Sequence, residues 1–194
     1  MGAATDRIDH RRYTVAEYVQ LEQYSNVRHE YVDGQIFALA GGTPEHSTYA
    51  ANVIGILTAQ LRGRPCRVQT SDGRIRVRAT GLITYPDVSV VCGRAEIDSE
   101  DADAIVNPTL VVEVTSPSPD DYDRGEKLDH YQRIPALREI LFVAYEEPRL
   151  DLVRRGTGGG WSRSSASSGA SLRLESLDCE IAVDAVYLDP LRAS

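Results

Sequence analysis

A carboxylate in the middle of an apolar strand is the feature that most constrains this chain. The segment from Leu110 to Thr115 reads Leu-Val-Val-Glu-Val-Thr, and its β-branched residues predict a buried strand. An unpaired carboxylate in such a strand costs on the order of several kcal/mol. Glu113 therefore needs a partner, which is an Arg or Lys side chain, a shared proton or a metal ion.

A second acid and a lysine occur in the sequence around this strand. Another apolar segment, Val88 to Cys92, predicts a strand that opens directly after Asp87, and Lys127 lies on a predicted helix over about 121–133. Two acids carried by strands, with a lysine nearby, suit a site that binds Mg²⁺ or Mn²⁺ and hydrolyses a phosphodiester bond.

Each of these residues also has a purely structural interpretation. Glu113 could form a buried ion pair with Lys127 or Arg124. The dipeptide Pro86-Asp87 is typical of a turn, and a single lysine on a helix is usually solvated. Only the order in which the three residues occur favours a joint role.

Length and composition indicate one globular domain over residues 1–194. The hydrophobic fraction of 42% is enough for one core. Residues 1–12 are charged, show no secretory signal and are expected to be flexible. No apolar segment is long enough for a membrane span, and three scattered cysteines favour reduced thiols. We therefore expect a cytoplasmic protein.

The net charge of −8 is unusual for a protein that binds nucleic acid, but the charge is unevenly distributed. Six arginines and one acid lie between Arg62 and Arg78, whereas residues 96–103 contain five acids and no base. This pattern predicts a polarised surface. Arg74, Arg76 and Arg78 alternate with apolar residues, so they should share one strand face and contact DNA phosphates. The alternative is that they protect an edge strand from aggregation.

The remaining pattern predicts an α/β fold with a central mixed β-sheet flanked by helices. Thr14 and Glu17 form a capping box for a helix to about Tyr24, and Thr43 caps a second helix that begins at Pro44. Hairpin turns are predicted at Asp33-Gly34 and at Asp72-Gly73. Further strands are expected over 139–145, 150–154 and the start of 180–188, with a mobile Gly/Ser-rich loop or hairpin over 156–171.

Four motifs occur in an order that resembles the PD-(D/E)XK nuclease superfamily. They are His29–Ile36, Tyr85–Val90, Val112–Ser118 and Tyr122–Lys127, with His46 between the first and second. More closely, the chain resembles the Uma two family of restriction-endonuclease-like proteins, by eye over roughly Tyr13 to Arg154. The resemblance implies a restriction-endonuclease-like core and a Mg²⁺-dependent endonuclease that acts on DNA.

The resemblance also implies roles for particular residues. Asp87, Glu113 and the carbonyl of Val114 would hold Mg²⁺ or Mn²⁺. The superfamily usually has a lysine two residues after the Glu, where this chain has Thr115, and Lys127 matches the position to which that lysine is thought to have moved. Further candidates are Glu30 as an additional catalytic acid, and His46 and Thr115 as accessory residues.

Three hypotheses follow. The first is an endonuclease, expected to be a homodimer because two sites related by a twofold axis can cut both strands of a duplex. The second is a catalytically inactive binding or scaffold protein on a nuclease fold, which the net charge and Thr115 favour. The third is a hydrolase of a small phosphorylated substrate, which a narrow pocket would favour. Walker-type phosphate loops, nucleophile elbows and zinc-ligand spacings are absent from the sequence.

Overall fold

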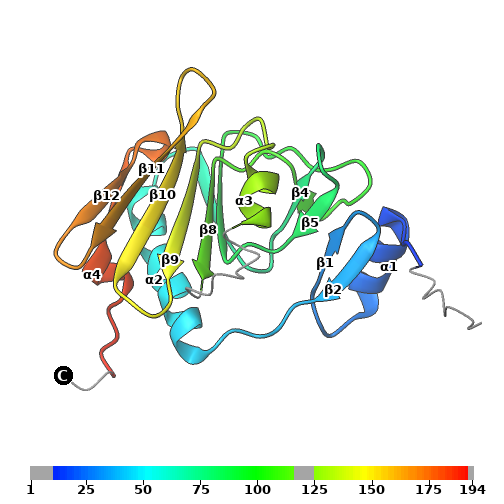
Figure 1. The fold of residues 1–194 in the computed structure, drawn as a ribbon, viewed down its shortest axis with the longest axis horizontal. Coiled ribbons are helices and arrows are strands. Elements are labelled where there is room, and N and C mark those ends of the chain that lie inside the picture. Colours follow the sequence, from blue (N-terminus) through cyan, green and yellow to red (C-terminus); the bar gives the residue numbers. More distant parts are fainter. Residues whose placement is uncertain (1–10, 116–124, 192–194) are drawn as a thin grey trace, which may run out of the picture.

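The computed structural model describes residues 11–115 and 125–191, which form two larger β-sheets on either side of a short helix (Figure 1). The first sheet is six-stranded and mixed, with the strand order β11-β10-β9-β8-β6-β3. Its strands are β3 (Cys66–Thr70), β6 (Val88–Cys92), β8 (Leu110–Thr115), β9 (Glu139–Ala144), β10 (Arg149–Arg155) and β11 (Trp161–Ser167). Among the described strands of this sheet, β8 and β9 pair in parallel, and the other neighbouring pairs are antiparallel. The predicted α/β fold with a central mixed sheet is confirmed.

Alternating side chains of the six-stranded sheet enter two different apolar cores. Val112 packs on one face with α2 (Pro44–Gln60), and Val111 packs on the other face with α3 (Glu126–Tyr131). The apolar residues of α2 recur at helical spacing, which explains why one side of this helix is buried. As a result, β8 lies between α2 on one face of the sheet and α3 on the other.

The second sheet is five-stranded, with the order β2-β1-β5-β4-β7. Its strands are β1 (His29–Val32), β2 (Gln35–Ala38), β4 (Arg74–Val77), β5 (Leu82–Thr84) and β7 (Ala104–Ile105). Residues of β4 and β5 share a core with α3 and with β8 and β9, so α3 is enclosed between the two sheets. This enclosure places side chains of α3 where they can reach acids from both sheets.

Several local predictions are confirmed in the five-stranded half. Thr14 and Glu17 form the capping box of α1 (Val15–Tyr24), whose buried Tyr18 packs on Tyr31 of β1. The hairpin of β1 and β2 turns at Asp33 and Gly34, which both have positive φ angles of 46° and 84°. A turn with two positive φ angles matches the right-handed twist of the flanking strands, which explains the Asp-Gly pair.

The hairpin predicted at Asp72-Gly73 is wrong. A turn does lie there, but β3 before it pairs with β6 in the first sheet, whereas β4 after it pairs with β5 and β7 in the second sheet. The chain therefore crosses from one sheet to the other at this turn. Turn residues report local backbone geometry and do not determine which strands pair.

The C-terminal part contains the hairpin that was one of two alternatives predicted for residues 156–171. Strands β10 and β11 pair on either side of a turn at residues 156–160. The chain continues through β12 (Ser171–Leu174), the 3₁₀ helix η1 (Glu175–Leu177), β13 (Cys179–Ala182) and α4 (Val183–Val186). The predicted helix over 121–133 is described only from residue 125, and its earlier part lies outside the described residues.

The expectation of three reduced thiols is also wrong. Cys66 and Cys92 face each other across the β3–β6 pair and form a disulfide, while Cys179 is a buried free thiol. Their separation of 26 residues in the sequence concealed a pairing that only the sheet register reveals. Among the described helices, none combines the length and the apolar character that crossing a bilayer requires.

Candidate active site

The two candidate acids come from neighbouring antiparallel strands. Val88 pairs with Val112, so the same register places Asp87, directly before β6, beside Glu113 of β8. One oxygen of Asp87, Oδ2, accepts a hydrogen bond of 2.7 Å from the backbone N–H of Val114. The side chain of Asp87 is 16% exposed and that of Glu113 is 4% exposed. Sheet pairing thus brings together two acids that are 26 positions apart.

Helix α3 supplies two partners for Glu113. Tyr131 donates its hydroxyl hydrogen bond to Glu113 Oε1, and Lys127 Nζ lies 3.8 Å from the same oxygen. Lys127 and Tyr131 are four residues apart, so they share one face of the helix. Tyr131 was not a candidate in the sequence, although its spacing from Lys127 is a signal that could have found it.

Lys127 is closer to Glu30 than to Glu113. Its Nζ lies 2.7 Å from Glu30 Oε1, and the hydroxyl of Thr84 donates a hydrogen bond to that oxygen. The side chains of Lys127 and Glu30 are each 6% exposed. The lysine therefore joins β1 of one sheet to β8 of the other, and Glu30 and Thr84 orient it.

His46 and Thr115 occupy different positions relative to the acids. His46 lies in the first turn of α2, which Thr43 caps, and its Nε2 is 3.2 Å from Asp87 Oδ2. Thr115 is a buried residue at the end of β8, on the same strand face as Glu113. The structure thus brings His46 into direct contact with a candidate acid.

These residues meet in one cleft of about 810 Å³. Its lining includes Asp87, Glu113, Val114, Lys127 and His46. Glu30 and Thr115 are not among the residues that line it, so Glu30 reaches the cleft through Lys127. A cleft of this volume is large enough for a nucleotide-sized group.

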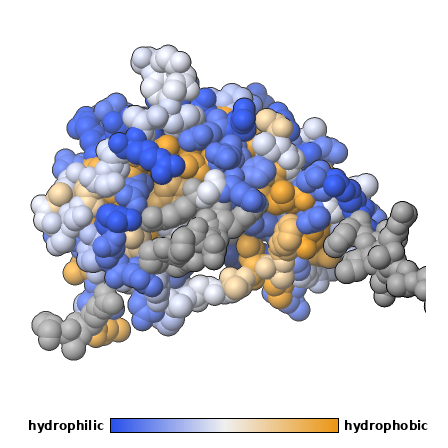
Figure 2. Space-filling view, viewed as in Figure 1, coloured by the Kyte–Doolittle hydropathy of each residue, from blue (hydrophilic) through white to orange (hydrophobic). Residues whose placement is uncertain are grey.

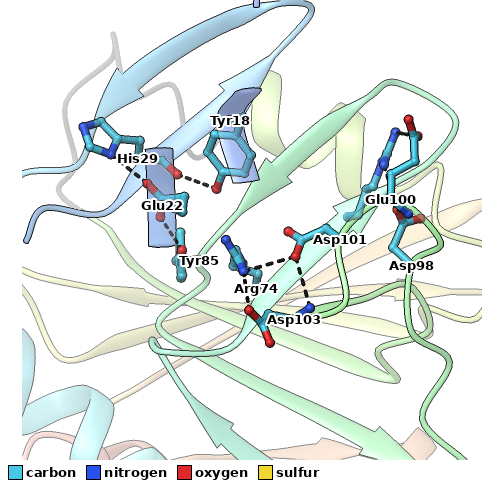
Figure 3. Close-up of polar contacts among 10 residues, drawn as sticks. Tyr18, Glu22, His29, Arg74, Tyr85, Asp98, Glu100, Asp101 and Asp103 are labelled. Atoms are coloured by element: carbon cyan, nitrogen blue, oxygen red, sulfur yellow. Dashed lines mark hydrogen bonds and ion pairs between the residues drawn. The ribbon is translucent and has the colours of Figure 1, made fainter. Parts of the chain in front are cut away.

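A polar network joins Tyr18, Glu22, His29 and Tyr85 (Figure 3). Glu22 of α1 accepts a hydrogen bond from the hydroxyl of Tyr85 and lies 2.7 Å from His29 Nδ1, while Tyr18 donates to the carbonyl of His29. Burial raises the pKa of Tyr85, so its hydroxyl stays protonated and donates to Glu22. Tyr85 lines the cleft two residues before Asp87, so this network positions the start of β6.

The surface is less polarised than predicted, because the second half of the basic segment, Arg74 to Arg78, packs on the acidic segment, as Figure 3 shows for Arg74. Arg74 forms ion pairs of 3.1 and 2.9 Å with Asp101 and Asp103, and Arg76 pairs with Asp98 at 2.7 Å. Arg74, Arg76 and Arg78 together form an arginine ladder. Its third member, Arg78, also pairs with Asp98 but remains 54% exposed. Strand pairing of β4 with β7 brings the two segments together, and the sequence could not show this.

The donor set fits a divalent cation of the Mg²⁺ type. Carboxylate and carbonyl oxygens are the ligands that such hard cations prefer, and Mg²⁺ is usually bound by one or two carboxylates, with water and substrate completing the coordination. Asp87, Glu113 and the carbonyl of Val114 provide this chemistry in one cleft. Within residues 11–115 and 125–191, no three His, Cys, Asp or Glu side chains form a ready-made cation cage.

Comparison with known proteins identifies a family and relatives. The sequence matches the Uma2 (Uma two) family, described as "putative restriction endonuclease", over residues 15–185. The chain is 36% identical over 171 residues to the uncharacterized protein slr1290 of Synechocystis sp., covering 88% of this chain and 89% of that protein. It is 30% identical over 143 residues to the Synechocystis protein sll1609, covering 74% of this chain and 78% of that protein.

The fold resembles that of a solved protein. A crystal structure of a "putative nuclease belonging to DUF820" from Anabaena variabilis superposes with a TM-score of 0.71 and 15% sequence identity. The match covers 90% of this chain and 97% of that chain. At this identity the likeness concerns the fold alone, and it confirms a restriction-endonuclease-like architecture.

Proposed function

The chain belongs to the Uma2 family of restriction-endonuclease-like proteins, and from its site geometry we propose that it is a metal-dependent nuclease that hydrolyses phosphodiester bonds in DNA. The observation that carries the proposal is the convergence of Asp87, Glu113 and Lys127 on one cleft. Two acids from adjacent strands and a lysine from a packed helix supply the charges that this reaction needs.

Each residue has a role that follows from its position. Asp87, Glu113 and the carbonyl of Val114 would hold Mg²⁺ or Mn²⁺, which when bound polarises the phosphate and lowers the pKa of a bound water. Lys127 places a positive charge beside the carboxylates, where it stabilises the charge that develops on the phosphate oxygens. The role of Glu30 in the site is to position Lys127 through their ion pair.

Three further expectations remain predictions. Arg78 is the arginine of its ladder that keeps an exposed side chain for a DNA phosphate, since Arg74 and Arg76 are 6% and 11% exposed. A homodimer is expected for double-strand cleavage, and light scattering in solution measures it. Cytoplasmic localisation was expected partly from reduced thiols, and the Cys66–Cys92 disulfide removes that argument, so cell fractionation is the test of this prediction.

The decisive experiment compares wild type with Glu113→Gln on plasmid and single-stranded DNA, in Mg²⁺ or Mn²⁺. We expect the substitution to reduce the cleavage rate by about 100-fold or more, because it removes a charged ligand of the metal. Glu126→Gln is the matched control, since Glu126 is an exposed acid on α3 next to Lys127. Cleavage that persists in Glu113→Gln contradicts the proposal. No cleavage by wild type, together with no Mn²⁺ binding in calorimetry, favours the inactive scaffold.

A further inference from the structure

The cleft offers few positive charges for a nucleic acid. Among the described residues that line it, only Arg28 and Lys127 carry a permanent positive charge, and Lys127 is paired with Glu30. The arginines of β4 are largely engaged with acids, and the net charge is −8. Proteins that bind duplex DNA typically neutralise several phosphates with Lys and Arg. This charge inventory argues against a long duplex as the preferred ligand.

One wall of the cleft, formed by α2, becomes apolar beyond its first turn. His46, Ala50 and Ile54 lie at spacings of four residues on one face of α2, and all three line the cleft. His46 contacts Asp87, and the apolar part of this face follows it, from Ala50 to Ile54, over about 6 Å of the helix. Ala51 adds a second small side chain to this face. Such a surface suits a planar apolar group better than a phosphate.

The other sheet continues the apolar lining. Leu39 and Ala40, which follow β2, line the cleft together with Val27, which is 49% exposed. Figure 2 shows hydrophobic side chains gathered beside β2, where the chain leaves this strand toward α2. Exposed apolar surface of this kind in a cleft marks a binding region. The acids therefore lie in a cleft that has apolar residues from both halves of the molecule.

A cation and an aromatic ring lie at the same cleft. The guanidinium of Arg28 is 5.7 Å from the ring centroid of Tyr85, and it donates a 3.0 Å hydrogen bond to the carbonyl of Ser71. Its side chain is 46% exposed and forms an ion pair with Asp72, which is 75% exposed. An ion pair between exposed groups contributes little, so Arg28 can exchange Asp72 for a phosphate at small cost.

We propose that the cleft binds one unstacked nucleotide of a single-stranded nucleic acid. Its base lies on the apolar part of α2 and on the segment after β2, its phosphodiester reaches Asp87 and Glu113, and Arg28 contacts a neighbouring phosphate. Unstacked bases bind apolar and aromatic surfaces, and the volume of the cleft suits a group of this size. The proposal rests on the proposed nuclease function and adds the substrate class: single strands in preference to regular duplex.

Binding is measured separately from cleavage. In the Glu113→Gln background, fluorescence anisotropy compares a single-stranded oligonucleotide with a duplex of the same sequence and length, in Mg²⁺. We expect the single strand to bind at least ten-fold more tightly. Adding Ala51→Glu should weaken single-strand binding at least ten-fold, because it places a charge on the apolar wall. Thr58→Glu is the matched control, two turns further along α2, exposed and outside the cleft lining.

The outcomes separate the two proposals. Equal or tighter binding of the duplex, or equal single-strand affinity of the Ala51→Glu and Thr58→Glu variants, overturns the single-strand inference. In cleavage assays of the wild type, Glu113-dependent hydrolysis of duplex at the same rate as single strand overturns it too, while the nuclease function stands. Tight single-strand binding without any Glu113-dependent cleavage supports the inference about the cleft and contradicts the nuclease function.

Discussion

At the scale of single residues, the site is a small set of buried charged side chains that form ion pairs with one another. Glu30, Lys127 and Glu113 are each at most 6% exposed at their side chains, and a single lysine serves both carboxylates. Burial of charges is costly unless each is paired and hydrogen-bonded. The hydroxyls of Thr84 and Tyr131 supply such hydrogen bonds, so these neutral residues belong to the charge network as much as the acids do.

Tyr131→Phe tests this network at its simplest point. The substitution keeps the ring in the core and removes only the O–H donor to Glu113. A buried charged acceptor that loses a donor costs about 1–3 kcal/mol, and we expect the free energy of unfolding to fall by that amount in urea titrations. Mn²⁺ binding should weaken as well, because the orientation of Glu113 is no longer fixed.

Tyr24→Phe is the control for this prediction, since Tyr24 is 82% exposed. It should change neither the unfolding free energy nor Mn²⁺ affinity. If Tyr131→Phe lowers stability and leaves Mn²⁺ affinity unchanged, Tyr131 contributes to the core alone. That result would remove it from the set of residues that position Glu113.

At the scale of elements, the pairing of β4 with the acidic segment changes the role of the arginine ladder. Burial opposes ionisation of Asp98, but the Glu100 backbone N–H, Arg78 and Arg76 outweigh it and hold the pKa of Asp98 below its ordinary value. A lowered pKa means that ionised Asp98 stabilises the fold above its unfolded pKa, and that this contribution is lost as the pH falls through the folded value.

Asp98→Asn should therefore destabilise the protein in a pH-dependent manner. We expect a loss of about 1–3 kcal/mol at pH 7, because two arginines lose a charged acceptor. The difference from wild type should shrink below about pH 4, because the carboxyl of the unfolded chain is then protonated, and it should vanish once the folded carboxyl, with its lower pKa, is protonated as well. Urea titrations at several pH values measure this difference.

Asp103→Asn is a matched control from the same segment, because Asp103 also pairs with an arginine of the ladder but is 75% exposed. Exposed ion pairs contribute little, so its effect at pH 7 should be much smaller. An Asp98→Asn variant as stable as wild type at pH 7 contradicts this account of the ladder. So does a difference that stays constant down to pH 3.

Elements whose signals are local could be predicted from the sequence. The capping box at Thr14, the Asp33-Gly34 turn and the apolar strand around Glu113 all depend on neighbouring residues, and the structure contains each of them. Asp87, Lys127 and His46 were also candidates, and the structure places them in one cleft. The family resemblance supplied Lys127 and His46, and the positions agree because each residue lies on a helix that packs against the sheet.

Features that depend on pairing between distant segments could not be predicted. The Asp72-Gly73 turn gives no sign that β3 and β4 belong to different sheets. The Cys66–Cys92 disulfide depends on the register of β3 with β6, and the neutralisation of Arg76 depends on the position of Asp98. The disulfide and the Arg76–Asp98 pair join residues 26 and 22 positions apart, and single-sequence patterns do not encode such contacts.

At the scale of the whole molecule, each of the two larger sheets contributes different residues to the site. The six-stranded sheet carries the acids, the five-stranded sheet carries Glu30 and the segment with Arg28, and α3 lies between them. The cleft forms where the halves meet. Its described lining carries little positive charge, and the molecule as a whole is acidic. Long-range attraction of a polyanion is therefore weak, and close contacts must supply the affinity.

This balance of charge predicts a shallow salt dependence of single-strand binding. Each phosphate contact with a single strand contributes a slope of about −0.7 in a plot of log affinity against log salt concentration. With Arg28 and Lys127 as the cations of the cleft, we expect a slope between about −0.7 and −1.5 in the Glu113→Gln background. Arg28→Ala should reduce its magnitude by about 0.7, whereas Arg163→Ala, at an exposed position of the outer strand β11, should leave it unchanged. Anisotropy titrations in NaCl measure all three slopes.

A slope steeper than about −4 would mean that at least five phosphates are contacted. The ligand would then follow a basic surface outside the cleft, and apolar contacts with one nucleotide would not be the main source of affinity.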